Sequence, residues 1–279
     1  MKLASFVHGD APPAIGVVQG ERIFPVEGIS DMNAVAADYA AHKPALERAL
    51  GGGGLPLAEM RLLPPITRPG KIMAIGLNYA DHILESGSAP PEQQTWFCKQ
   101  ISSLNGPYDS VEVPKVSAAL DYEAELVVVI GKGGRHIARS EAAAHVLGYC
   151  VGNDVSVRDW QLATSQWVIG KSFDTHAPIG PWVTTSDEVS DPHGLDIRCL
   201  VNGEQRQGSN TRQLVFDVWA QIEHLSQAMT LEPGDLIFTG TPGGVGGAAT
   251  PPFRLKDGDV VRVEIDRLGH IENVCRDEI

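Results

Sequence analysis

The sequence has little positive charge: 22 lysine and arginine residues stand against 35 aspartate and glutamate residues, a formal net charge of −13. Proteins that bind nucleic acids need clustered lysine and arginine to contact phosphates, so this balance argues against a nucleic-acid partner. It does not exclude a small anionic substrate, because a bound cation can dominate the local field.

Closely spaced cysteines and long apolar runs are also missing. The four cysteines are scattered and none has CxxC spacing, so we expect reduced thiols, as in a cytoplasmic protein. No apolar run approaches the length that crosses a membrane, and the first residues lack the apolar region of a signal peptide. We therefore predict a cytoplasmic protein that has no membrane partner.

A proline-rich connector at residues 63–70 divides the chain. Before it, short strands are predicted at 14–18 and 22–26, with an alanine-rich helix at 31–50. We place a small N-terminal domain at residues 1–67 and a catalytic domain at 68–279, which is well within the length that can bury a large core.

Strand-like runs dominate the second part of the chain and are separated by turn signals such as Asn202-Gly203. Only two helices of any length are expected, at 140–147 and 216–229. The mix predicts a β-rich α+β fold with peripheral helices. The expected strands are 72–76, 126–130, 149–153, 197–201, 236–239 and 260–265.

Three carboxylates lie where two of these strands begin or end. Glu123 and Glu125 are two residues apart at the mouth of the 126–130 strand, so their side chains point to the same side. Asp154 follows the strand that ends at residue 153. Adjacent like charges are costly unless a positive charge lies between them. Oxygen ligands without nearby cysteine or histidine suit Mg²⁺ or Mn²⁺, so we predict a metal site here.

A histidine and a glutamate follow the first strand of the second part. His82 and Glu85 are three residues apart and would share one face of a short helix, for which Asn78 is a candidate cap. A carboxylate beside an imidazole fixes its tautomer and raises its basicity, which suits a base that activates water. Taken alone, the pair is more often an exposed ion pair of little consequence.

Two glycine-containing segments resemble nucleotide-binding loops but fail the full patterns. Gly170-Lys171-Ser172 lacks the earlier glycine of a phosphate-binding loop, and Lys171 alone would pass for a surface lysine. The loop after Thr239 contains GxGxxA, but prolines follow it where a dinucleotide fold needs a helix. Arg158 and Gln161 follow Asp154 closely and could reach the same pocket, with Arg158 pairing to a substrate carboxylate.

Five motifs follow one another in a recognisable order. They are GLNYADH at 76–82, DYEAEL at 121–126, GYCVGNDVSVRD at 148–159, GKSFD at 170–174 and PGDLIFTGTPGGVG at 233–246. Over roughly residues 68–275 the chain resembles the fumarylacetoacetate hydrolase family, and residues 1–67 resemble the lead-in domain of its longer bacterial members. Five ordered motifs are far more specific than any one alone.

The resemblance implies a mixed β-roll or β-sandwich core with a small N-terminal α/β domain, a homodimer, and one Mg²⁺ or Mn²⁺ per subunit. By position, Glu123, Glu125 and Asp154 would be metal ligands, and His82 and Glu85 the water-activating dyad. Lys171 would stabilise an oxyanion or enolate. The residues that bind the substrate would be Arg158, Gln161, Thr241 and Tyr79.

The predicted reaction is hydrolysis of the C3–C4 bond of a 2,4-dioxo acid (an acylpyruvate), giving pyruvate and a carboxylic acid, in the catabolism of aromatic compounds or sugar acids. Decarboxylation of oxaloacetate or isomerisation of a 2-hydroxydienoate would use the same metal site without water attack. A non-catalytic binding module and a carboxylate cluster without metal are the remaining alternatives. The substrate, the choice between Mg²⁺ and Mn²⁺, the role of the N-terminal domain and lid behaviour of residues 79–106 are not readable from the sequence.

Overall fold

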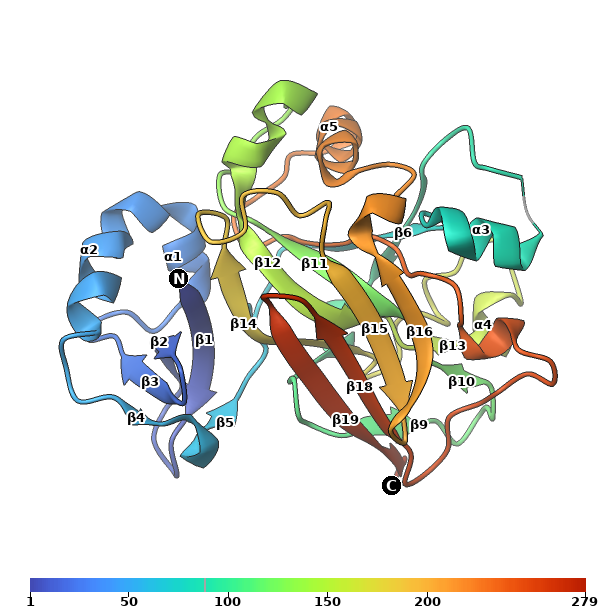
Figure 1. Ribbon diagram of the computed structural model, residues 1–279, viewed down its shortest axis with the longest axis horizontal. Coiled ribbons are helices and arrows are strands. Elements are labelled where there is room, and N and C mark those ends of the chain that lie inside the picture. Colours follow the sequence, from blue (N-terminus) through green and yellow to red (C-terminus); the bar gives the residue numbers. More distant parts are fainter. Residues whose placement is uncertain (88) are drawn as a thin grey trace.

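The fold is known from a computed structural model that describes residues 1–87 and 89–279, and most of its strands form one large mixed sheet (Figure 1). The strand order is β4-β3-β2-β1-β14-β12-β11-β17-β6-β7, with β5 pairing to β1 and β8 to β14. The N-terminal strands are β1 (Lys2–Val7), β2 (Ala14–Gln19), β3 (Arg22–Pro25), β4 (Leu55–Pro56) and β5 (Arg61–Leu62). The others are β6 (Ile72–Gly76), β7 (Thr95–Lys99), β8 (Leu104–Asn105), β11 (Ala124–Ile130), β12 (Val146–Asn153), β14 (Ala177–Thr185) and β17 (Leu236–Phe238).

A second sheet packs against the central strands, as β15, β16, β18 and β19 show in front of β11 and β12 (Figure 1). Its order is β16-β15-β18-β19-β9, and a separate two-stranded ribbon pairs β10 with β13. These strands are β9 (Val111–Val113), β10 (Leu120–Asp121), β13 (Ser156–Val157), β15 (Asp196–Val201), β16 (Glu204–Asn210), β18 (Val260–Ile265) and β19 (Gly269–Asp277).

The helices are short and lie around the sheets (Figure 1). The α-helices are α1 (Met32–Ala37), α2 (Tyr39–Ala49), α3 (Ala80–Ser86), α4 (Arg158–Gln161) and α5 (Val218–Ala228). The 3₁₀ turns are η1 (Leu57–Glu59), η2 (Ile101–Ser103), η3 (Arg139–His145), η4 (Thr211–Gln213) and η5 (Gly246–Ala248). This arrangement confirms the predicted β-rich α+β class.

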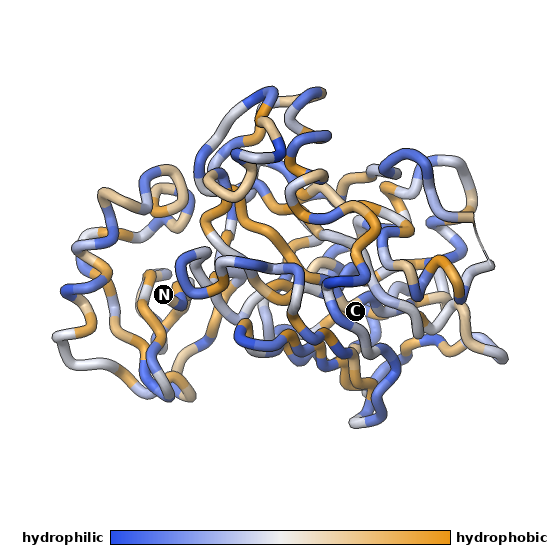
Figure 2. The backbone as a smooth tube through the Cα atoms, turned by 45° about the horizontal axis from the view of Figure 1, so that its top comes forward, coloured by the Kyte–Doolittle hydropathy of each residue, from blue (hydrophilic) through white to orange (hydrophobic). Residues whose placement is uncertain are grey.

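Strand β11 explains why the core forms where it does. All seven of its residues are buried, since the strand is covered on both faces. Leu126 and Val128 face the core that is shared with the second sheet, whereas Val127 and Val129 face a core shared with the N-terminal strands. Hydrophobic segments accordingly concentrate along the central strands, with hydrophilic loops outside (Figure 2). The strand that carries Glu125 and directly follows Glu123 is therefore held from both sides.

Two helix predictions need correction. The expected helix at 31–50 is broken at Asp38, whose backbone leaves the helical region and whose side chain caps α2 by accepting from the Ala41 N–H at 3.0 Å. The expected helix at 140–147 is the 3₁₀ turn η3, which ends at His145 because Val146 pairs with Ile130 and begins β12.

Asn78 is also not a helix cap. Tyr79 occupies the N-cap position of α3, and the Asn78 side chain instead donates to the carbonyl oxygens of Phe216 and Thr239 at 2.9 and 2.8 Å. It therefore ties the start of α3 to the end of β17. Within the described ranges, no helix is long and apolar enough to cross a membrane.

Candidate active site

The antiparallel pairing of β11 with β12 assembles the three predicted metal ligands. Glu125 lies opposite Gly152, and the Asp154 N–H donates to the Glu123 carbonyl at 2.9 Å, so the start of one strand meets the end of the other. One carboxylate oxygen from each of Glu123, Glu125 and Asp154 lies within 4.8 Å of the others, and all three residues are buried. The two-residue spacing and the strand-end position were therefore correct guides to proximity.

Two buried lysines neutralise part of this cluster. The Lys171 ammonium is 2.7 Å from Glu123 Oε2 and 2.7 Å from Asp154 Oδ2, and the residue is only 2% exposed. Lys99 Nζ lies 2.6 Å from Asp154 Oδ1 and also donates to the backbone oxygens of Val155 and Lys171. Lys171 is thus an internal cation of the site and not a surface lysine. Gly170 permits this, because a Cβ there would lie 2.2 Å from the Gln161 nitrogen of α4.

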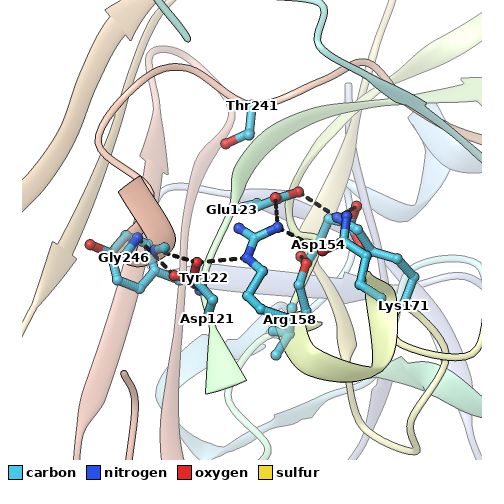
Figure 3. Close-up of polar contacts among 12 residues, drawn as sticks. Asp121, Tyr122, Glu123, Asp154, Arg158, Lys171, Thr241 and Gly246 are labelled. Carbon is cyan, nitrogen blue, oxygen red and sulfur yellow. Dashed lines mark hydrogen bonds and ion pairs between the residues drawn. The ribbon is translucent and has the colours of Figure 1, made fainter. Parts of the chain in front are cut away.

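Arg158 bridges the cluster to the glycine-rich loop (Figure 3). Its Nε is 2.8 Å from Asp121 Oδ2, and its Nη1 is 2.7 Å from Glu123 Oε1. Asp121 in turn accepts the backbone N–H groups of Gly246 and Gly247, each at 2.8 Å. Arg158 Nη2 is buried without a hydrogen-bond partner, and a buried guanidinium N–H of this kind normally has an acceptor.

The pKa values of the two glutamates diverge for a clear electrostatic reason. Burial disfavours ionised Glu123, but Lys171 and Arg158 outweigh that effect and lower its pKa to about 2. Burial raises the pKa of Glu125 well above its usual value, and the charges of Asp154 and Glu123 raise it further. The charge of Lys171 and the Gly240 N–H, at 2.7 Å from Oε2, favour the ionised form of Glu125 but do not outweigh those effects.

A count of charges shows what the cluster needs. With Glu125 ionised, four carboxylates meet three cationic side chains, so one negative charge is unbalanced within the described part of the chain; without a bound cation, the raised pKa of Glu125 favours its neutral form instead. The carboxylates are those of Asp121, Glu123, Glu125 and Asp154, and the cations are Lys99, Arg158 and Lys171. A divalent cation held by oxygen donors satisfies this demand, and the donor set fits Mg²⁺ or Mn²⁺.

His82 and Glu85 face the cluster from α3. His82 Nδ1 is 3.3 Å from Glu85 Oε2, and the Glu85 carboxylate accepts the Gly244 N–H at 3.0 Å. Their side chains are 13% and 31% exposed, so the pair is more sheltered than an ordinary surface ion pair. The glycine-rich loop thereby holds the carboxylate that orients the imidazole.

Most of these groups line one pocket of about 480 Å³, whereas Lys99, Asp121 and Asp154 lie behind its surface. One wall is apolar and includes Ile75, Phe97, Leu162 and Trp167; the Trp167 ring fills the space where a Cβ on Gly76 would stand. The polar side holds His82, Glu85, Glu123, Glu125, Arg158, Gln161, Lys171, Thr241 and Arg254. A concave site with an apolar wall and a few convergent charged groups is typical of small-ligand binding.

The predicted substrate residues do not all reach this pocket. Gln161 and Thr241 line it: Gln161 accepts from Arg158 Nη1 at 2.9 Å, and Thr241 Oγ1 accepts from Gln207 at 2.9 Å. Tyr79 is fully buried in the core and is not among the residues that line the pocket. Its ring packs inward because it stands at the N-cap of α3, opposite Leu214.

Three residues that contact or line the site were not predicted as site residues from the sequence. Lys99 ends an ordinary-looking strand and Arg254 follows two prolines, so neither belongs to a motif that signals a site. Asp121 begins the DYEAEL motif, but the motif alone predicted no function for its carboxylate. Their places depend on pairings between distant strands and loops, which single-sequence patterns do not encode.

Comparison with known proteins now adds to this geometry. Residues 71–276 match the family described as fumarylacetoacetate (FAA) hydrolase C-terminal, and residues 1–65 match Rv2993c-like, N-terminal. The chain belongs to the fumarylacetoacetate hydrolase family. The predicted domain boundary near residue 67 stays a prediction, since β1 shares a sheet with β14.

Relatives within the family carry different activities. The chain is 49% identical over 221 residues to the mitochondrial oxaloacetate tautomerase FAHD2A of Bos taurus, covering 78% of this chain and 70% of the relative. It is 35% identical to maleylpyruvate hydrolase of Sphingobium sp. SYK-6, solved with manganese(II) and pyruvate (TM-score 0.86, all of both chains). It is 33% identical to a 5-carboxymethyl-2-hydroxymuconate delta-isomerase of Mycobacterium smegmatis (TM-score 0.82, all of both chains). The protein is thus an enzyme of a family of hydrolases and isomerases.

Proposed function

We propose that this protein is a divalent-cation-dependent tautomerase that interconverts the enol and keto forms of oxaloacetate. The observation that carries the proposal is that Glu123, Glu125, Lys171 and the imidazole–carboxylate dyad line one pocket, with Asp154 buried directly behind as the third member of the carboxylate triad. Oxaloacetate, and not another 2-oxo acid, is supported by the 49% identity to the bovine tautomerase.

The reaction moves one proton from the 2-hydroxyl oxygen to C3 and shifts the double bond from C2–C3 to C2–O. His82, oriented by Glu85, is placed to carry that proton, and its return in the reverse direction uses the same imidazole. A cation held by Glu123, Glu125 and Asp154 would supply Lewis acidity for the negative charge that develops on the substrate.

Lys171 and Arg158 have defined tasks in this scheme. An ammonium has three N–H donors and the two carboxylates take two of them, so Lys171 can direct the third toward the developing enolate oxygen. The unpartnered Nη2 of Arg158 is suited to a substrate carboxylate, with Gln161 and Thr241 beside it.

A second candidate is the hydrolysis of a 2,4-dioxo acid to pyruvate and a carboxylic acid. It is favoured by the sheltered His82–Glu85 dyad and by the manganese and pyruvate in the Sphingobium maleylpyruvate hydrolase. His82 would take a proton from water, the hydroxide would attack C4, and the C3–C4 bond would break. Lys171 would stabilise the C4 oxyanion, an effect worth about 3 kcal/mol for one well-placed donor.

The deciding experiment compares metal-free and Mn²⁺- or Mg²⁺-loaded protein on oxaloacetate, acetylpyruvate and fumarylpyruvate. We expect metal-dependent acceleration of enol loss from oxaloacetate, followed by its ultraviolet absorbance, without release of CO₂ or pyruvate. Pyruvate and a carboxylic acid from the acylpyruvates, with no effect on the enol, would overturn the proposal in favour of the hydrolase. CO₂ from oxaloacetate would indicate a decarboxylase. A homodimer and a cytoplasmic location stay predictions.

A further inference from the structure

Arg254 stands out among the cations of the pocket because no carboxylate balances it. His82, Arg158 and Lys171 each pair with at least one carboxylate. For Arg254, by contrast, no carboxylate of residues 1–87 or 89–279 lies within the 4.0 Å of an ion pair. An unpaired guanidinium that lines a pocket, in a protein of net charge −13, is a candidate site for an anionic group of the ligand.

The backbone on both sides fixes where Arg254 stands. The Phe253 N–H donates to Gly246 O at 2.9 Å, and the Leu255 N–H donates to Leu120 O at 2.9 Å. Arg254 Nη1 itself donates to Phe253 O at 2.9 Å, which holds the guanidinium against the loop. The Phe253 ring is covered by the guanidinium of Arg206, 4.7 Å from the ring centroid. The position is therefore built by the fold and is not that of a free surface side chain.

Arg254 also lies close to the group that we assign to the first substrate carboxylate. A Cβ placed on Gly247 would be 3.5 Å from Arg158 Nε and 3.6 Å from Arg254 Nη1. The same Cβ position is 3.2 Å from Asp121 Oδ2, which already pairs with Arg158 Nε, so the two guanidinium groups flank Gly247 while Arg158 Nη2 stays without a partner. Guanidinium groups recognise carboxylates through paired N–H donors, and two of them that flank one glycine and line one pocket suit the two ends of one short diacid.

We propose that Arg254 binds the second carboxylate of the substrate, so that the pocket selects dicarboxylic 2-oxo acids over monocarboxylic ones. This inference rests on the proposed function, because it assumes that the metal site and Arg158 hold the first carboxylate and the 2-oxygen. It adds a specificity-determining residue and predicts that acetylpyruvate, which has one carboxylate, is a poorer ligand than a diacid of similar size.

The test measures binding and does not depend on turnover. Calorimetry with Mn²⁺-loaded protein would compare 2-oxoglutarate with 2-oxopentanoate, which has the same five-carbon chain and a methyl group in place of the second carboxylate. We expect the wild type to prefer the diacid by about tenfold or more, and Arg254→Gln to lose that preference. Arg212→Gln, which removes an exposed arginine outside the pocket, is the matched control and should retain it.

Each result has a distinct meaning. An unchanged preference in Arg254→Gln would overturn the inference, and so would equal weakening of both acids, which would place Arg254 on the first carboxylate instead. Failure of both acids to bind the wild type in a Mn²⁺-dependent manner would overturn it together with the proposed metal site. Loss of the diacid preference in a protein that does not tautomerise oxaloacetate would support Arg254 and contradict only the proposed reaction.

Discussion

At the scale of single residues, Glu123 and Glu125 differ in what balances their charge. Glu123 is paired with Lys171 and Arg158, whereas Glu125 is stabilised by one backbone N–H. Glu125→Gln removes a carboxyl group whose ionised form is disfavoured by burial and by two neighbouring carboxylates, so we expect the free energy of unfolding of metal-free protein at pH 8 to rise by about 1 kcal/mol. Glu123→Gln removes one of the two carboxylates that Lys171 and Arg158 each pair with, and should lower it by about 3 kcal/mol. Urea denaturation of the two variants measures the contrast.

Metal binding supplies the complementary measurement for the same pair of variants. Both lose a carboxylate ligand, so the rise in melting temperature that Mn²⁺ gives the wild type should vanish in each. If Glu125→Gln retained the full Mn²⁺ effect, the assignment of Glu125 as a ligand would be wrong. If the two variants were equally destabilised without metal, the electrostatic difference between the glutamates would be contradicted.

His176 makes folding stability depend on pH. Burial lowers its pKa to about 4, and the neutral ring donates its Nε2–H to Glu112 O at 2.8 Å. In the unfolded chain a histidine has a pKa of about 6.5. Between these values the unfolded state binds a proton that the folded state does not. The stability due to neutral His176 is therefore complete above pH 6.5 and is lost as the pH falls toward 4, by up to about 3 kcal/mol.

A His176→Gln variant isolates this effect from other titrating groups. Glutamine keeps a donor for Glu112 O but does not titrate, so the stability gap between wild type and variant should narrow as the pH falls from 7 to 4.5. Chemical denaturation at several pH values gives both curves. Parallel curves over that range would show that His176 does not couple folding to pH.

Some residues of the candidate site were predicted from the sequence and others were not, for physical reasons. The two-residue period of a strand places Glu123 and Glu125 on one side, and Asp154 follows directly after a strand end, so local patterns sufficed for the triad. Lys99 and Arg254 reach the site only through long-range pairing, which has no local signature. Tyr79 neighbours the dyad in sequence but faces the core, since adjacency along the chain does not determine which way a side chain points.

At the scale of elements, the dyad depends on the contact between α3 and the glycine-rich loop. Gly244 adopts φ +98°, and a Cβ there would be 2.1 Å from Arg206 O. Gly244→Ala should therefore displace the N–H that holds Glu85. We expect at least a tenfold fall in kcat, because small misplacements of catalytic groups are costly, and a loss of about 2 kcal/mol in stability. Steady-state kinetics and thermal unfolding measure both effects.

The neighbouring glycine gives the control. A Cβ on Gly243 would meet its nearest atom, Asp81 O, at 3.5 Å, which is ordinary van der Waals contact. Gly243→Ala should therefore stay within about twofold of wild-type kcat. Equal loss in both variants would show that the loop is sensitive to any side chain and that the Gly244 N–H has no special part.

Helices and strands were predicted correctly where a local pattern of apolar residues specifies them. They were missed where a strand forms only by pairing with a distant segment. The strands at 72–76 and 260–265 match β6 and β18 because apolar or alternating runs specify them. Strand β16 was missed because its sequence EQRQGSN is polar, and it forms by pairing with β15. β14 contains two prolines, which argue against a strand in isolation. The 31–50 helix divided because Asp38 caps a new helix better than it continues the old one.

At the scale of the whole molecule, the N-terminal segment and the catalytic part form one sheet. β1 pairs with β14, with Lys2 opposite Thr184 and Leu3 opposite Val183. Leu3 and Ile15 belong to the same core cluster as Phe238. The family matches treat residues 1–65 separately, but the physical structure has no gap in backbone pairing at that point. The two segments are therefore expected to unfold together.

Deleting residues 1–65 tests this view of the molecule. The deletion would strip β14 of its neighbour β1 and expose the apolar face that the N-terminal strands and helices cover. An uncovered apolar sheet edge promotes association between chains, so we expect the fragment 66–279 to aggregate or to unfold without a cooperative transition. The full-length Leu3→Ala variant, at a fully buried position, should still fold but lose about 3 kcal/mol. Gel filtration and thermal unfolding distinguish these states. A monodisperse fragment that unfolds cooperatively and binds Mn²⁺ would instead make the N-terminal segment an independent domain, because the catalytic part would then stabilise β14 and the triad without it.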